Sequence, residues 1–258
     1  MKTATLILLA AALAAPALAQ KHELVYAKDG SGVFGYKDTP KQPWSGYVVH
    51  DPDRPLPKKV DTTPGRPPSD AIVLFDGKDL SRWKPNKWKL GPGWVETTTG
   101  PFETRDEYGS FQLHIEWRAP VEPTENIMNR GNNGVRLMDL FEIQIFDSYR
   151  TPIYPDGQAA SVYGQTPPMV NACRRPGEWE VYDIVFFAPR FRAGKLEAPA
   201  RTTVLHNGLL VLHNQEIYGV TGHAALPAPY PPGRTRGPLS LSGHNCPVRF
   251  RNIWIRPL

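Results

Sequence analysis

The sequence predicts an all-β protein whose main domain is an antiparallel β-sandwich. Segments in which apolar and polar residues alternate recur along the chain, and this period of two is typical of strands with one buried face. Turn-forming residues such as Gly, Pro, Asn and Asp separate these segments. Almost no stretch has the period of a long amphipathic helix, so the helical crossovers that parallel sheets need are not expected.

The first 19 residues predict a secretory signal peptide. Lys2 supplies a positive start, residues 5–15 form a short apolar run, and residues 17–19 (Ala-Leu-Ala) match a small-residue cleavage site. The run is too short and too rich in alanine for a stable membrane span. We therefore expect cleavage after Ala19 and a periplasmic or secreted protein.

Residues 20–69 predict an extended N-terminal arm. Prolines crowd positions 40 to 68, and their density opposes helices and central strands. Aromatic residues such as Phe34 and Trp44 are more numerous here than in a free linker. We expect the arm to lie along the domain surface with these side chains docked, and a disordered tether is the alternative.

The folded domain is predicted to span residues 70–258, which is enough chain for one sandwich core. An Asn-Gly pair at positions 207–208 predicts a hairpin between residues 202–205 and 210–213. A single turn of helix is expected at residues 79–83. Strands are predicted at residues 71–75, 88–95 (interrupted by a Gly-Pro-Gly turn), 111–117, 140–145, 181–187, 201–206, 209–213, 238–241 and 248–255.

The strand that begins near Leu140 has an unusual polar face. Aromatic and β-branched residues alternate with Glu142 and Gln144, and Asp147 follows three residues later. The change from a step of two to a step of three predicts a β-bulge that returns Asp147 to the face of Glu142 and Gln144. Two carboxylates and an amide in one row can bind sugar hydroxyls and transfer protons. A solvated outer strand is the alternative.

Further candidate residues lie on loops and near strand ends. Tyr163 and Gln165 belong to a long loop, residues 149–176, and loops of this length are often functional, although a packed Ω-loop is equally compatible. His206 and His244 lie near predicted strand ends, where a single histidine is more often structural than catalytic. The other candidates for a sugar-binding face are Glu116, Asn132, Asn133 and Arg136.

Charge and cysteine content restrict the partners. The predicted signal peptide contains one of the 30 basic residues and none of the 25 acidic ones, which leaves 29 against 25 and a net charge of about +4. No run of five or six Lys or Arg residues and no basic helix occurs, so nucleic acid is not an expected partner. Cys173 and Cys246 could form one disulfide or remain free buried thiols, and neither has metal-site or redox-motif spacing.

Eight blocks follow one another in a characteristic order: LFDGKDLSRW, FQLHIEW, GNNGV, FEIQIFDSY, DGQAASVYGQTPP, RPGEWEVYDIVFFAPRF, ARTTVLHNG and PVRFRNIWIRPL. In this order, over residues 71–258, the chain resembles the 3-keto-disaccharide hydrolase family. The resemblance implies a concanavalin-A-like lectin/glucanase fold, a jelly-roll sandwich. It also implies an enzyme that cleaves glycosides already oxidised to a ketone at carbon 3.

The implied chemistry needs a base, a group that stabilises an enolate, and an acid for the leaving oxygen. A ketone at carbon 3 acidifies the proton on carbon 2, and its removal allows β-elimination of the carbon-1 substituent, followed by hydration. Glu142 is the expected base, with Arg136, His206 or His244 at the enolate. Alternatively, Glu142 and His206 hold a divalent cation that polarises the ketone.

Positioning of the sugar hydroxyls is expected from the remaining polar residues, which are Asp147, Gln144, Glu116, Asn132, Asn133, Tyr163 and Gln165. The chain departs from the family pattern at Gly243, where an acid usually precedes the histidine. Two alternatives stay open: a non-catalytic carbohydrate-binding sandwich, and a conventional retaining endoglucanase with paired carboxylates. Two residues argue against the endoglucanase: Gln144 stands where such an enzyme has an acid, and Asp147 has a side chain one methylene shorter than glutamate.

Overall fold

The computed structural model describes residues 21–122 and 126–258, and the chain divides into two units at residue 59. The predicted signal peptide, residues 1–19, lies outside the described residues. Within the described ranges, no helix has the length and apolar character needed to cross a membrane. In the first unit, β1 (Leu24–Tyr26) and β2 (Phe34–Tyr36) pair antiparallel. Docking of this unit's aromatic side chains on the domain stays a prediction.

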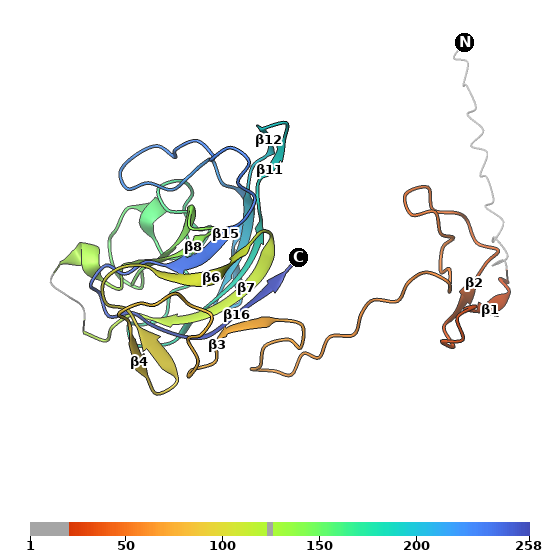
Figure 1. Cartoon of the computed structure of the whole chain (residues 1–258), viewed down its shortest axis with the longest axis horizontal. Helices are drawn as coiled ribbons and strands as arrows, with labels where there is room; N and C mark the ends of the chain where they lie inside the picture. Colours follow the sequence, from red (N-terminus) through yellow and green to blue (C-terminus); the bar gives the residue numbers. More distant parts are fainter. Residues whose placement is uncertain (1–20, 123–125) are drawn as a thin grey trace, which may run out of the picture. The chain divides into compact units, whose positions relative to one another are not determined.

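The second unit consists of two antiparallel sheets, which confirms the predicted β-sandwich (Figure 1). The strands of the larger sheet are β3 (Ile72–Phe75), β4 (Lys89–Gly91), β5 (Trp94–Glu96), β7 (Phe111–Arg118), β10 (Glu180–Phe187), β13 (Arg201–His206), β14 (Leu209–Glu216) and β16 (Arg249–Pro257). The smaller sheet has the order β6 (Phe102–Tyr108), β15 (Gly237–Leu241), β8 (Asn133–Leu137), β9 (Phe141–Ile145).

The order of the larger sheet is β14-β13-β10-β7-β16-β5-β4, with β3 also paired to β16. Three further short elements complete the described structure: the hairpin of β11 (Arg190–Arg192) and β12 (Lys195–Ala198), and the 3-10 turns at Ile127–Asn129 and Pro155–Gly157. Figure 1 shows β6, β8 and β15 in one layer and β7 and β16 in the other.

Alternation along the strands builds the core between the sheets. In β7 every second residue, from Phe111 to Trp117, is buried, whereas the intervening polar residues are half-buried. In β8 and β9, Val135 and Ile143 contribute to the same core cluster. Because side chains of a strand alternate between faces, Arg136, Glu142 and Gln144 must lie on the opposite, outer face of the smaller sheet.

The outer face of β9 is covered, whereas the sequence predicted a half-buried strand. All five residues of β9 are buried, because Phe141, Ile143 and Ile145 lie in the core and loop residues surround Glu142 and Gln144 on the outer face. The segment around residues 160–163 pairs with the free edge of the strand. The Gln144 amide donates to Ser161 O over 3.0 Å, and the Tyr163 amide donates to Glu142 O over 3.0 Å. Sequence alternation does not reveal such a cover, since it comes from a distant loop.

Two local expectations differ from the structure. The β8–β9 register runs without a shift, so the expected bulge is not present there, and Asp147 lies two residues beyond the end of β9. Within residues 79–83 the structure has one hydrogen-bonded turn instead of a helical turn, with the Trp83 amide donating to Leu80 O. The predicted Asn-Gly hairpin is confirmed, since β13 and β14 pair across residues 207–208.

Candidate functional site

A cavity of about 550 Å³ lies on the outer face of the smaller sheet, and we call it the sheet pocket. Its floor is made by Arg136 of β8 and by Glu142 and Gln144 of β9. Loops from four other parts of the chain form its walls. The complete lining is Met128, Asn132, Arg136, Glu142, Gln144, Tyr163, Thr221, Gly222, His223, Ser242 and His244.

Among the residues that the structure describes, Glu142 is the only carboxylate in the lining of this pocket. Its residue is 9% exposed, and its Oε2 accepts a hydrogen bond from Arg136 Nη1 over 3.2 Å. Gly134 makes room for it, because a Cβ there would come within 2.1 Å of Glu142 Oε1. Burial raises the pKa of Glu142, against the opposing effect of Arg136. A carboxyl group with a raised pKa can exchange protons nearer to neutral pH.

Arg136 is held in place from its other side. Its Nε donates to Asp139 Oδ1 over 3.1 Å, and its Nη2 donates to Asp139 O over 3.0 Å. Asp139 in turn accepts from the Ser240 hydroxyl over 2.6 Å. The guanidinium is therefore fixed beside Glu142 and offers a preorganised positive charge to the pocket.

Gln144 has an unsatisfied acceptor. Its residue is 2% exposed, and its Oε1 is buried without a hydrogen-bond partner within the described part of the chain. A buried acceptor left unpaired costs about 1–3 kcal/mol, which a ligand that donates to it recovers. Together with the Glu142 carboxylate on the same face, this oxygen suits a sugar hydroxyl or a hard cation.

One wall of the sheet pocket is a chain of hydrogen-bonded rings. Tyr163 Oη lies 2.8 Å from His223 Nδ1, and Tyr154 Oη lies 3.0 Å from Tyr163 Oη. Burial and the bond to Tyr154 raise the pKa of Tyr163. On the pocket wall, burial together with the charge of Arg136 lowers the pKa of His244, so its imidazole is neutral at pH 7. Such groups can donate or accept protons near a bound sugar.

Sequence reasoning missed His223 and Thr221. Thr221 Oγ1 accepts from the Glu142 amide over 3.0 Å and so fixes the loop to β9. Both residues belong to the long irregular segment between β14 and β15, where no periodicity marks a function. The length of that segment was the available signal, because long loops without regular structure are often functional.

Asp147 does not share the face of Glu142 and lies outside the sheet pocket. Its carboxylate accepts from Arg130 Nη2 over 2.9 Å, and only 4% of its side chain is exposed. It borders a separate cavity that also contains Arg150 and Arg175. Because β9 ends at Ile145, the chain has already turned away when it reaches this residue.

Three other predicted residues have structural partners instead of a place in the pocket. Glu116, on the larger sheet, pairs with Arg251 over 2.6 Å; hydrogen bonds from His114, Asn252 and Arg251 outweigh its burial and lower its pKa to about 2. Asn133 is fully buried on the core side of β8. Gln165 bridges the Tyr218 amide and Gly219 O.

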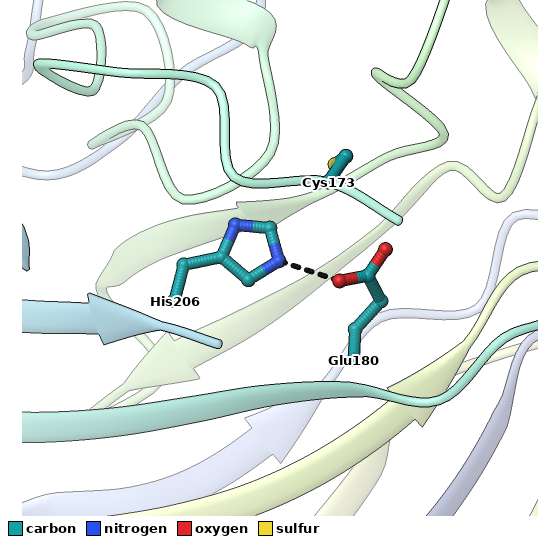
Figure 2. Close-up of side chains that lie close together, drawn as sticks. All are labelled: Cys173, Glu180 and His206. Atoms are coloured by element: carbon teal, nitrogen blue, oxygen red, sulfur yellow. Dashed lines mark hydrogen bonds and ion pairs between the residues drawn. The ribbon is translucent and has the colours of Figure 1, made fainter. Parts of the chain in front are cut away.

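His206 lies in a buried cluster with Glu180 and Cys173, apart from the sheet pocket (Figure 2). His206 Nε2 is 2.9 Å from Glu180 Oε2, while Glu180 Oε1 accepts from the Arg174 amide over 2.7 Å. Asn207 Nδ2 donates both to Glu180 and to Ala172 O. The structure therefore does not bring His206 and Glu142 together for a shared cation.

The cluster of Cys173, Glu180 and His206 is the one group of three ionisable metal-ligand side chains within 4.8 Å among residues 21–122 and 126–258. Both oxygens of Glu180 are already engaged by N–H donors, and burial raises the pKa of the Cys173 thiol, which keeps it neutral. Glu180 thus connects the loop before β10 to His206 and Asn207, and we call this hydrogen-bonded group the clamp. Cys173 and Cys246 are both free in this structure.

Comparisons with known proteins show the family to which the chain is related. Residues 70–256 match the family model of the 3-keto-alpha-glucoside-1,2-lyase-like domain. A crystal structure from Parabacteroides distasonis, described as a candidate glycosyl hydrolase, is 37% identical with a TM-score of 0.76, covering 85% of this chain and all (100%) of that one. A second from the same organism is 23% identical with a TM-score of 0.55, covering 73% and 99%, and shows the fold alone. No curated protein matches the chain.

Proposed function

Because the chain belongs to the family of 3-keto-alpha-glucoside-1,2-lyase-like domains, we propose that this carbohydrate-active protein cleaves 3-keto-glycosides by β-elimination across carbons 1 and 2. The observation that carries the proposal is Glu142, a buried carboxylate with a raised pKa that faces a sugar-sized cavity beside a fixed arginine. The family is described as 1,2-lyase-like, which supports an elimination across carbons 1 and 2.

The reaction begins with Glu142 as general base. Its carboxylate accepts the proton from carbon 2, and the carbon–hydrogen electron pair moves to form the enolate of the carbon-3 ketone. Arg136 and the neutral imidazole of His244 stabilise the enolate oxygen, because both can present N–H donors to it. The pocket is preorganised, so this stabilisation needs little rearrangement.

Departure of the carbon-1 group completes the elimination. The enolate reforms the ketone, a double bond forms between carbons 1 and 2, and the bond from carbon 1 to the leaving oxygen breaks. His223, held by Tyr163, gives a proton to that oxygen. Water then adds across the new double bond, which makes the overall reaction a hydrolysis, and Gln144 holds a sugar hydroxyl through its unpaired oxygen.

A divalent cation remains part of the proposal as a second means of polarising the ketone. Glu142 and Gln144 offer the oxygen ligands that hard cations prefer. When bound there, the cation would act as a Lewis acid on the keto oxygen. Loss of activity in EDTA that Mg²⁺ or Mn²⁺ restores would support it, and full activity after EDTA treatment would exclude it.

The test is turnover of 3-keto-trehalose and methyl 3-keto-α-glucoside by the chain from Gln20 onward. Glu142→Gln should lower kcat/KM by about 10³-fold, as expected for loss of a general base. Glu116→Gln is the matched control, because it removes a carboxylate paired with arginine on the other sheet, and it should retain turnover. Exchange of the carbon-2 hydrogen in D₂O reports the first step separately.

Two outcomes would contradict the proposal. Undiminished turnover in Glu142→Gln would remove its assigned base. Sugar binding without turnover of any 3-keto-glycoside would favour the non-catalytic binding module. A retaining endoglucanase is disfavoured, because it needs a second carboxylate about 5–5.5 Å from the first, and the described part of the sheet pocket lining, which leaves out residues 123–125, offers Glu142 no such partner.

A further inference from the structure

A second cavity, of about 430 Å³, adjoins the sheet pocket, and we call it the side pocket. The two cavities share Tyr163 and His223 in their linings. These two rings are nearly parallel, with 11° between their planes. The shared rings therefore form the boundary at which one bound molecule can extend from one cavity into the other.

The side pocket differs from the sheet pocket in chemical character. Its outer part is lined by the ring of Tyr154, which is 40% exposed, and by Leu226, which is 90% exposed, together with Ala224 and Ala225. As far as the described ranges 21–122 and 126–258 go, its lining contains no lysine or arginine, and Asp156 is its one carboxylate. Such a surface favours a flat apolar group and disfavours an anion.

The exposed leucine is presented by a loop that is closed at its base. Val220 and Ala228 exchange backbone hydrogen bonds of 2.8 and 3.0 Å, so residues 221–227 project as a tight loop. Gly219 packs against this base, since a Cβ there would come within 2.3 Å of Ala228 O. An almost fully exposed Leu226 at the rim of a cavity is an apolar surface that a ligand can cover.

We propose that the side pocket is the leaving-group subsite, and that it receives an apolar, planar aglycone such as a benzyl group. The proposal rests on the proposed function, because it assumes that the keto sugar occupies the sheet pocket. The carbon-1 oxygen then lies at the shared rings, where His223 protonates it, and the aglycone extends over Tyr154 and beneath Leu226. Specificity for the aglycone is thus set by Tyr154 and Leu226, which lie outside the lining of the sheet pocket.

The experiment compares benzyl and methyl 3-keto-α-glucosides, whose parent alcohols are of similar acidity, so that intrinsic leaving ability does not decide the result. A third substrate, 3-keto-trehalose, carries a sugar as its leaving group. The wild-type chain should prefer benzyl over methyl in kcat/KM by about tenfold or more, the size of effect that apolar contacts in a pocket give. Leu226→Ser should reduce that preference several-fold and leave the methyl glycoside unaffected.

Leu196→Ser is the matched control, because Leu196 is a half-exposed leucine on β12 outside both linings, and it should retain the full preference. Turnover of all substrates without a benzyl preference would overturn the subsite while leaving the proposed function intact. In calorimetry, where leaving ability plays no part, tighter binding of trehalose than of benzyl α-glucoside would overturn its apolar character. If no 3-keto-glycoside is turned over, calorimetry decides: tighter binding of benzyl than methyl α-glucoside, lost in Leu226→Ser, would support the subsite, and equal binding would overturn it.

Discussion

Burial and the neighbouring Arg136 act on the Glu142 carboxyl group in opposite directions, and burial has the larger effect. As a base, Glu142 must be ionised, so kcat/KM should fall on the acid side at a pH above the ordinary glutamate value of 4.5. Arg136→Met removes the influence that lowers the pKa of Glu142. The acid limb should therefore move to higher pH.

A pH–rate profile of both proteins measures this shift. Arg251→Met is the control, since Arg251 pairs with Glu116 on the other sheet, and its acid limb should coincide with that of the wild type. An unmoved limb in Arg136→Met would show that the titrating group is not Glu142.

Gly134 gives Glu142 its space on the sheet. In Gly134→Ala the new Cβ would come within 2.1 Å of Glu142 Oε1, so the carboxylate must move. A displacement of about 1 Å at a catalytic group can cost about 100-fold in rate, and we expect a loss of that order in kcat/KM. Gly109→Ala is the control, because its Cβ would meet nothing closer than 3.4 Å; equal activity of the two variants would contradict this role of Gly134.

The sequence could predict which face of the sheet a residue occupies where that face follows from strand periodicity alone. Glu142 and Gln144 share a face because they are two apart on one strand, and the structure places both in the sheet pocket. Asp147 could not be placed this way, since its position depends on where β9 ends. His223 reaches the pocket through a long irregular loop, and neither periodicity nor spacing predicts the path of such a segment.

At the scale of elements, the clamp at Glu180 connects β10, the start of the Asn-Gly turn and the loop before β10. Glu180→Ala would leave His206, the Arg174 amide and Asn207 without their shared acceptor in a buried place. Removing one partner of a buried charged network typically costs about 3–5 kcal/mol. We expect a loss of about 3 kcal/mol in the free energy of unfolding, measured by urea denaturation.

Glu107→Ala provides the comparison. Glu107 is exposed, and its backbone carbonyl oxygen accepts a hydrogen bond from Arg236 Nη2, which an alanine at this position would retain. Exposed substitutions of this kind change stability by about 0.5 kcal/mol or less. A loss below about 1 kcal/mol in Glu180→Ala would mean that the clamp is not a significant source of stability.

Strands could be predicted from the sequence where one face of the strand packs on the core and the other is partly exposed to solvent. β7 alternates between buried and half-buried residues along its whole length, as its sequence indicates. β6, with the sequence FETRDEY, was not predicted, because three consecutive residues at its centre are exposed and charged. Its place in the sheet comes from pairing with β15, a partner more than a hundred residues away, which no local pattern encodes.

For the whole molecule, the core of the second unit is self-contained. Every residue of its hydrophobic cluster lies at or after position 72. A chain that starts at Val60 should therefore fold with a free energy of unfolding within about 1 kcal/mol of the full chain, as judged by urea denaturation, since single cores of this size need no further segment. A larger loss would show that the aromatic residues of the first unit dock on the sandwich.

The pairing of residues 160–163 with β9 has a consequence for self-association. The segment Phe141–Phe146 reads FEIQIF, a short, β-prone and weakly charged sequence of the kind that forms cross-β aggregates when its edge is free. The same loop that supplies Tyr163 to the pocket occupies that edge. Opening of this loop would expose the edge of β9, an aggregation-prone strand. We therefore expect ligands to enter the sheet pocket while residues 160–163 stay paired with β9.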